Sequence, residues 1–506
     1  MTEFSFNLVD EPWIPCTDHE GGKRLLSLHD FFIYAHEMRS LSCQNPLAEA
    51  ALLRVLLAVV HRAVNGPKKR DDWKELYLKK HFDERLTEYL EKWRNRFDIF
   101  STDKPFYQTK GLLVINEKGE PVPQYITSIM LGTSSGNNKT LFDHTTANLP
   151  IRLTPAEAVM TLITAQMYSL GGLNRKTTKP FGYQQSFLNA VMVSGIFLFL
   201  VGESMFESLL LNLLVYDDVE PIPNTPDDAP VWERSDLGGT GAKEPKGYLD
   251  FLTCKCRHII LVPERTNGMV TVEHIHIAQG EAFPSIPNPS FLSKKSKEGN
   301  WYHPQLDVDR LVWRDSVSLF SLDEVDDRRP KAFRQVGNAS MRAIVNLPRR
   351  YNCTSIALAN DKANPLAWRR ESLNVPLSLL SDKETVATLK VGMSLAEEGA
   401  DAVRKSVFKF MLEFLPKKSK DVGEKAAASG AVQRYWDMME GHFHRFLLDL
   451  EEPEKALMMW FVSVKRTARE SLKTCITGRY RDSARSYQAW TLAEDYINVL
   501  LSKMTK

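Results

Sequence analysis

The sequence predicts an α+β protein, with a large irregular N-terminal α+β domain over residues 1–380 and a C-terminal four-helix bundle over residues 381–506. Three observations support this prediction. Residues 45–97 carry apolar side chains at helical spacing. Residues 110–380 contain short apolar runs separated by glycine and proline, a pattern typical of short elements joined by long loops. After residue 381 the chain consists of amphipathic segments of helical length.

The N-terminal elements begin with a short predicted strand, "FNLV", and continue as helices. From Asn45 to Val64 the pattern predicts a helix with Asn45 as N-cap and Pro46 in the first helical position. A second, charged helical stretch runs from Asp71 to Phe97. The most apolar run, residues 187–201, is shorter than the roughly 20 residues that a membrane-spanning helix needs, so we predict a buried strand or core helix.

Four amphipathic segments predict the C-terminal bundle, at residues 383–415, 431–450, 453–476 and 482–504. Lys465, Arg469 and Lys473 are spaced so that they share one helical face. This basic stripe is either a solvated surface or a track for a polyphosphate backbone. Further cations between residues 463 and 486 give this region seven positive against two negative charges, a local +5; these cations are Arg466, Arg479, Arg481 and Arg485.

Composition is that of a soluble globular protein, with 43% hydrophobic and 25% charged residues. The net charge is only +2, so binding to a polyanion would depend on local patches. No basic segment precedes an apolar run at the N-terminus, so we expect no secretory signal, no membrane partner and a cytoplasmic location. Six cysteines in 506 residues do not form a disulfide framework.

Sequence motifs nominate no enzyme and no cofactor. P-loop, dinucleotide-binding, nucleophile-elbow, zinc-protease and kinase signatures are absent. His144 follows Asp143 in "LFDHTTAN", a pair that suits acid–base or metal chemistry but is also common on a polar surface. A zinc site, as in a zinc-dependent hydrolase or deaminase, is an alternative in which the ligands would be Cys254, Cys256, His274 and His276. The other interpretation is that these residues lie on the face of a sheet.

The stretch "YSLGGLNRKTTKPFG", residues 168–182, places Gly171 and Gly172 before a group of cationic and hydroxyl residues. Glycine allows a backbone to approach a partner closely, and the residues after it suit phosphates. Because no nucleotide-binding motif is present, we expect no ATP or dinucleotide to bind here, and nucleic acid remains a candidate. A turn with solvated cations is the alternative.

Several phrases resemble the CasA family, the large subunits of type I-E CRISPR (Cascade) surveillance complexes. They are "FNLVDEPWIPC" (6–16), "DKPFYQTKG" (103–111), "LGGLNRK", "GESMFESLLLNLL" (202–214) and "ANDKANPLAWRRESLNVP" (359–376). The phrases occur in family order and span nearly the whole chain. A large subunit of another type I subtype, or a scaffold without DNA contacts, remains an alternative.

The resemblance implies a non-catalytic subunit that reads the protospacer-adjacent motif (PAM) of double-stranded DNA from the minor groove. It further implies that this subunit starts strand separation and R-loop formation, holds the displaced strand and helps to recruit a helicase–nuclease. Other Cascade subunits and the 5′ end of the guide RNA would be its remaining partners. A narrow groove with a degenerate pattern suits a glycine backbone and tolerance of several PAMs.

The resemblance also assigns residues to these roles. The glycine loop comprises Gly171, Gly172, Asn174, Arg175, Lys176 and Lys179, and the wedge that enters beside the PAM comprises Asn360, Asp361, Lys362 and Ala363. Arg265 is the only cation where the family has a lysine finger. Arg369 and Arg370 would clamp the DNA backbone or form structural ion pairs, and the basic stripe would follow the displaced strand. Phe142 and His144 fall in the loop that contacts the complex near the guide RNA.

Overall fold

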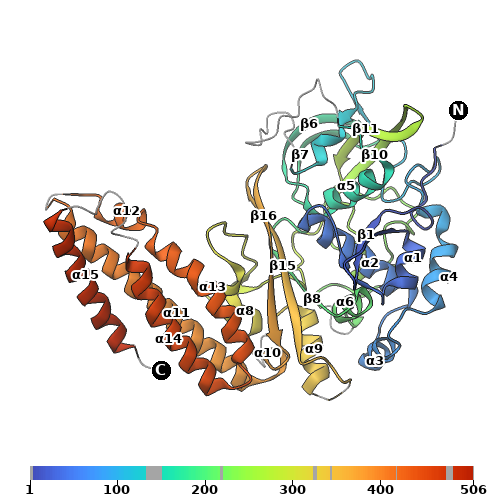
Figure 1. The fold of residues 1–506 in the computed structure, drawn as a ribbon. Helices are drawn as coiled ribbons and strands as arrows, with labels where there is room; N and C mark the ends of the chain where they lie inside the picture. The colour runs from blue at the N-terminus through green and yellow to red at the C-terminus, as the bar shows by residue number, and fades with distance from the viewer. Residues whose placement is uncertain are drawn as a thin grey trace. The chain divides into compact units, whose positions relative to one another are not determined.

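The structure is a computed structural model that describes residues 4–132, 151–216, 220–322, 327–341, 343, 345–416, 419–473 and 483–504. The chain forms two units (Figure 1). Unit 1 comprises Met1–Leu311, Arg328–Asn346 and Asn352–Ser372, and unit 2 comprises Val312–Asp327, Leu347–Tyr351 and Leu373–Lys506. The last and longest segment of unit 2 begins at Leu373, and two short earlier segments also belong to this unit.

Unit 1 combines helices with several small sheets. Its helices are α1 (Leu28–Tyr34), α2 (Pro46–Ala63), α3 (Arg70–Leu78), α4 (Glu84–Lys92), η1 (Arg94–Arg96), η2 (Ile126–Ile129), α5 (Pro155–Tyr168), α6 (Met205–Asn212), α7 (Tyr248–Leu252) and α9 (Lys331–Met341). Its strands are β1 (Ile14–Asp18), β2 (Lys23–Leu26), β3 (Met38–Leu41), β4 (Leu113–Ile115), β5 (Gln124–Tyr125), β6 (Gly172–Lys179), β7 (Gly182–Phe187), β8 (Ile196–Val201), β9 (Gly241–Ala242), β10 (Arg257–Thr266), β11 (Met269–Gln279), β12 (Glu281–Ala282), β13 (Lys294–Lys295) and β14 (Trp301–Tyr302). The hairpin of β15 (Arg350–Asp361) and β16 (Asn364–Pro376) lies mostly in this unit.

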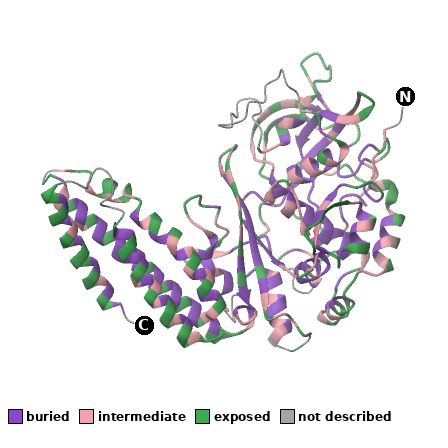
Figure 2. Ribbon diagram, viewed as in Figure 1, coloured by how far each residue is buried: buried purple, intermediate pink, exposed green. Residues whose placement is uncertain are grey.

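Helix α2 lies in the core of unit 1 and is buried around nearly its whole circumference (Figure 2). The Asn45 side chain accepts a hydrogen bond from the Ala48 N–H at 2.9 Å, and Pro46 occupies the first turn. Both features match the cap predicted from sequence. A helix that is apolar on all sides needs protein on all sides, which explains its central position.

The predicted helix from Asp71 to Phe97 is wrong as a single element, because the structure breaks it into α3, α4 and η1. Lys80 adopts a left-handed backbone conformation with φ of 63°, and the Asp83 side chain then caps α4 by accepting from the Arg85 N–H. Asp83 thus starts a new helix within a stretch of uniform helical composition. The apolar run at residues 187–201 contains the buried strand β8, one of the two predicted alternatives.

The sheets that concern the functional site are β4-β6-β7, β10-β11-β5 and β16-β15-β8. In the last of these, β15 pairs with β8 only from Asn352 to Ala357. The four following residues of β15 and the turn into β16 extend beyond the end of β8. This extension leaves the tip of the long hairpin free to contact other elements of unit 1.

Unit 2 is helical, and the helices predicted from the amphipathic pattern are present. Its elements are η4 (Val312–Asp315), α8 (Ser316–Phe320), α10 (Ser378–Ser381), α11 (Lys383–Phe414), α12 (Val422–Ala427), α13 (Ala431–Asp449), α14 (Pro453–Leu472) and α15 (Ala484–Lys503). Trp460 of α14 is buried and donates its indole N–H to the Gly392 carbonyl of α11 at 2.6 Å. Trp313 stacks on Phe443 of α13 at 4.6 Å, which explains why residues 312–327 belong to this unit. None of the helices in the described ranges is long and apolar enough to cross a membrane.

Candidate nucleic-acid interface

The glycine loop lies between the end of α5 at Tyr168 and the start of β6 at Gly172. The Gly171 N–H donates to Asn189 Oδ1 at 2.6 Å. A Cβ at Gly171 would lie 2.9 Å from the Phe187 carbonyl oxygen, so any side chain here would displace backbone. Gly172 has φ of 154°, which L-residues rarely adopt. Both glycines are therefore required by the local structure, whatever the loop binds.

Arg257, at the start of β10, holds this loop from beneath and was not identified from sequence. Its side chain is 1% exposed and its guanidinium donates to the carbonyls of Leu170 at 3.0 Å and Leu188 at 2.7 Å, on either side of the loop. The guanidinium also lies 4.7 Å from the centroid of the Phe187 ring. Burial lowers the pKa of Arg257 to about 10, so it remains charged at neutral pH. The sequence feature that could have pointed to Arg257 is its position at the start of the largely apolar run "RHIILV".

The β6–β7 hairpin presents the cations that follow the glycines. Its register is irregular between Leu173 and Lys176, and Arg175 within this bulge has φ of 48°. Arg175 and Lys179 are exposed, while Asn174 and Lys176 are half-buried. Burial lowers the pKa of Lys176, and Asn174 Nδ2 is buried without a hydrogen-bond partner. No ion pair joins these three cations to any residue that the structure describes.

The wedge is the tip of the β15–β16 hairpin. Lys362 and Ala363 form the turn, in which Lys362 adopts φ of 54° and Asn360 Nδ2 donates to the Lys362 carbonyl at 2.7 Å. Asp361 and Lys362 are exposed, and Leu366 on β16 is 63% exposed. The tip thus combines the Lys362 ammonium group, which forms no ion pair with a described residue, with the accessible apolar side chain of Leu366.

The structure brings the glycine loop and the wedge together, although about 190 residues separate them in sequence. A Cβ built on Gly172 would lie 3.1 Å from the Cβ of Ala363. Leu173, beside the glycine, is 71% exposed, and Leu366 of the wedge hairpin is also largely exposed. The loop backbone, the wedge turn and their cations therefore form one surface of unit 1.

Arg369 and Arg370, on β16, are engaged within the chain. Arg369 donates to the Arg310 carbonyl at 3.1 Å and to Glu371 at 3.3 Å. Arg370 forms a two-pronged ion pair with Glu49 of α2, at 2.9 and 3.3 Å. Sequence analysis left two roles open for these arginines, a clamp on the DNA backbone or structural ion pairs, and these contacts are of the second kind.

Arg265 lies near the tip of the β10–β11 hairpin. Strand β10 continues to Thr266, and Asn267 and Gly268 form the turn into β11. Both turn residues have positive φ, as a tight two-residue hairpin requires. The Arg265 guanidinium is 5.8 Å from the Phe4 ring centroid and donates weakly to the Gly268 carbonyl at 3.5 Å. It is exposed, and no described contact connects it with the glycine loop or the wedge.

The basic stripe of unit 2 lies on α14. Lys465 is 4.0 Å from the Phe461 ring centroid, and desolvation together with nearby Arg469 lowers its pKa. Arg469 donates to Asn498 at 2.9 Å, and Lys473 caps the helix and is exposed. Arg485 instead donates to the carbonyls of residues 413 and 415 at the end of α11, which removes it from the stripe. Arg479 and Arg481 lie outside the described residues, as do Phe142, Asp143 and His144.

Comparison with known proteins identifies the family. The model of the family described as CRISPR-associated protein Cse1 matches residues 7–471. The chain belongs to the Cse1 family. A curated CasA/Cse1 protein of Thermus thermophilus is 29% identical over 530 residues, covering 99% of this chain and 98% of the relative.

Solved structures show the same fold. Cse1 from Acidimicrobium ferrooxidans superposes with a TM-score of 0.84 at 22% identity, covering 99% of each chain. A chain of a structure described as a CRISPR RNA-guided surveillance complex superposes with a TM-score of 0.77 at 18% identity, covering 98% of this chain and 99% of that one. The α+β fold class predicted from sequence is therefore confirmed, as is the family resemblance.

The four residues proposed as zinc ligands in this Cse1-family chain do not converge. Cys254 and Cys256 are buried with their sulfur atoms 3.3 Å apart. The Gly280 N–H donates to the Cys256 carbonyl, so Cys256 lies opposite Gly280. Gly280 is four residues from His276, which is about 13 Å in extended chain, so Cys256 and His276 are well separated. His276 Nδ1 instead accepts from the Val114 N–H at 3.1 Å. The zinc-enzyme alternative therefore loses its site.

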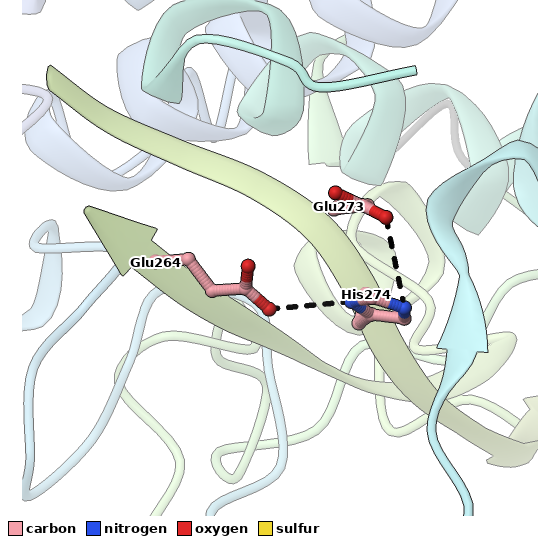
Figure 3. A group of neighbouring side chains, drawn as sticks. All are labelled: Glu264, Glu273 and His274. Carbon is pink, nitrogen blue, oxygen red and sulfur yellow. Dashed lines mark hydrogen bonds and ion pairs between the residues drawn. The ribbon is translucent and has the colours of Figure 1, made fainter. Parts of the chain in front are cut away.

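One other group of possible metal ligands occurs among the described residues: Glu264, Glu273 and His274 on β10 and β11 (Figure 3). His274 Nδ1 is 3.3 Å from Glu264, and His274 Nε2 is 3.9 Å from Glu273. The two carboxylates thus face different nitrogens of the ring. Glu273 also pairs with Arg152 at 2.7 Å. We assign this group to hydrogen bonding and charge pairing between neighbouring strands.

Proposed function

We propose that this chain is the large subunit of an RNA-guided CRISPR surveillance complex of the type I-E kind, and that it reads the PAM of double-stranded DNA. The observation that carries the proposal is the contact of Gly172 with Ala363, because it joins a side-chain-free backbone to a projecting hairpin tip. A narrow minor groove about 6 Å wide admits such a backbone where a side chain would collide. The proposed role is binding and positioning, with no catalytic step.

Charge at this surface supports a DNA ligand. Arg175, Lys176, Lys179 and Lys362 surround the glycine loop and the wedge, with Asp361 as the adjacent acid. Cations without protein partners can neutralise phosphates and release counterions, which positions the duplex without specifying sequence. Asn174, whose amide nitrogen lacks a partner, adds a hydrogen-bond donor beside the glycines.

The wedge turn is proposed to start strand separation and so R-loop formation. Lys362 at its tip would pair with a flanking phosphate, while Leu366 supplies apolar surface. Insertion of a hairpin at a base step costs a few kcal/mol of stacking, which pairing with the guide offsets. Arg265 is a further cation for the DNA backbone, whereas Arg369 and Arg370, which already bond within the chain, are left out of the proposed contact set.

The remaining partners are proposed from the family and from unit 2. The stripe of Lys465, Arg469 and Lys473 would bind the displaced strand, since single strands bind along cationic tracks. Phe142 and His144 would contact the complex near the 5′ end of the guide RNA. Other Cascade subunits and a helicase–nuclease would dock on the same chain, and the proposed location is the cytoplasm.

The test uses the complex reconstituted with guide RNA, with and without this chain, and duplexes carrying a randomised trinucleotide beside a guide-matched target. Lys362→Ala is expected to weaken PAM selection while leaving assembly intact. Lys23→Ala is the matched control, because Lys23 is an exposed lysine on β2 of the same unit. If selection were indifferent to the chain, or if Lys23→Ala weakened it as much, the proposal would be refuted.

A further inference from the structure

A second cationic site lies in unit 1, in a cavity of about 280 Å³. Its wall is formed by the loop at residues 103–110, which carries the phrase "DKPFYQTKG", and by residues 231–237. Five cations line the cavity: Arg96, Lys104, Lys110, Arg234 and Lys255. Only two acids do so, Asp103 and Asp236.

Lys255 is the unusual member of this set. It is 5% exposed, so its ammonium group is almost completely removed from water. Its Nζ donates to two carbonyl oxygens that belong to the cavity wall, Gln108 at 3.4 Å and Leu237 at 3.3 Å. No carboxylate lies within ion-pair distance of it in the described ranges. An ammonium group has three donors, so one remains for a ligand.

The carboxylates near the cavity are already neutralised. Arg234 pairs with Asp250 at 2.7 Å and Glu281 at 2.9 Å, and Lys243 bonds to the same Glu281 at 3.0 Å. Two cations and two buried acids thus form a neutral set behind the cavity. Of the other four lining cations, Lys104 bonds to the Arg234 carbonyl at 3.1 Å and to no other residue in the described ranges, and Lys110 is 4.0 Å from the highly exposed Asp103.

Arg96 also lines the cavity, and its Nη1 is buried without a hydrogen bond to any residue that the structure describes. The charge of Arg96, Lys104, Lys110 and Lys255 against Asp103 and Asp236 is 4 − 2 = +2. Burial of a cation without a counter-ion, as at Lys255, is unfavourable, and a bound anion removes that cost. Burial also lowers the pKa of Lys255 to about 8, which is consistent with a missing counter-charge.

We propose that this cavity is a binding site for a phosphate group, held by Lys255 and Lys104 with Arg96 at its edge. The dianionic oxyanion matches the +2 charge, and its oxygens accept the donors that the protein leaves free. The site is independent of the glycine loop and the wedge. The phosphate can be inorganic phosphate or the terminal phosphate of a polynucleotide, which share this chemistry.

The test measures binding to the full chain by isothermal titration, at constant ionic strength, of inorganic phosphate and of a short oligonucleotide with either a 5′-phosphate or a 5′-hydroxyl. Lys255→Met and Lys104→Gln are each expected to weaken phosphate binding at least about tenfold, because each removes a charged donor. Lys118→Gln, at an exposed turn outside the cavity, should change it less than about twofold. Circular dichroism verifies folding, and Lys104→Gln serves if Lys255→Met does not fold.

Each outcome is decisive. Saturable binding of inorganic phosphate that both cavity variants weaken supports the site. Binding of the 5′-phosphorylated oligonucleotide alone, weakened by the same variants, supports it and assigns the phosphate to a strand end. The proposal is overturned if neither inorganic phosphate nor the 5′-phosphorylated oligonucleotide binds, or if both cavity variants leave the binding unchanged.

Discussion

Replacement of Arg257 by methionine should loosen the glycine loop and destabilise unit 1. The guanidinium donates to the carbonyls of Cys256, Leu170 and Leu188 at 2.8, 3.0 and 2.7 Å. The contact with Cys256 is buried and those with Leu170 and Leu188 are part-buried, and a buried carbonyl left without a donor costs roughly 1–3 kcal/mol, a part-buried one less. Removal of a buried charge returns part of that total, because its desolvation no longer opposes folding. We therefore expect a net loss of about 2–4 kcal/mol in the free energy of unfolding.

Urea unfolding and hydrogen exchange measure this effect at two levels. The unfolding midpoint should fall, and amide exchange should accelerate most in peptides covering residues 169–172 and 187–189. Arg257→Lys is the matched control, since one ammonium group keeps the charge but reaches fewer carbonyls, and it should give an intermediate loss. A methionine variant with wild-type stability and unchanged exchange at these peptides would refute the assigned role of Arg257.

Three further predictions concern charge. Lys176→Gln should reduce the slope of log affinity for PAM duplex against log salt concentration by about 0.9, the value for one phosphate contact, and an unchanged slope would exclude that contact. A double-mutant cycle of Glu49→Gln and Arg370→Gln should give a coupling of about 0.5–1 kcal/mol in urea unfolding, because the pair is partly exposed; no coupling together with loss of DNA affinity would assign Arg370 to DNA instead. Burial lowers the pKa of His61 from 6.5 to about 4, so in this pH range the unfolded chain binds a proton that the folded chain does not. The free energy of unfolding should therefore be highest above pH 6.5 and fall by about 3 kcal/mol as the pH drops to 4. Unfolding free energies of wild type and His61→Gln measured from pH 7 to pH 4 should diverge accordingly, and parallel pH profiles would contradict this.

Local patterns determined several elements of this protein. The N-cap Asn45 and Pro46 define the start of α2 through contacts within four residues, and the amphipathic repeat defines the long helices of unit 2. The glycines at 171 and 172 marked a place of close backbone approach, which the structure explains through Phe187. Family phrases in order along the chain identified the Cse1 family.

Long-range contacts determined the rest, because the sequence does not show which distant residues meet. Ala363 lies against Gly172, and Arg370 pairs with Glu49, which is 321 residues away. Strand register separated Cys256 from His276, although both fit a metal-ligand pattern. Tertiary structure alone also placed Arg257 beneath the glycine loop and buried Lys255 in a cavity wall where no described carboxylate lies within ion-pair distance of it, since burial and partners depend on the packed fold rather than on neighbouring letters.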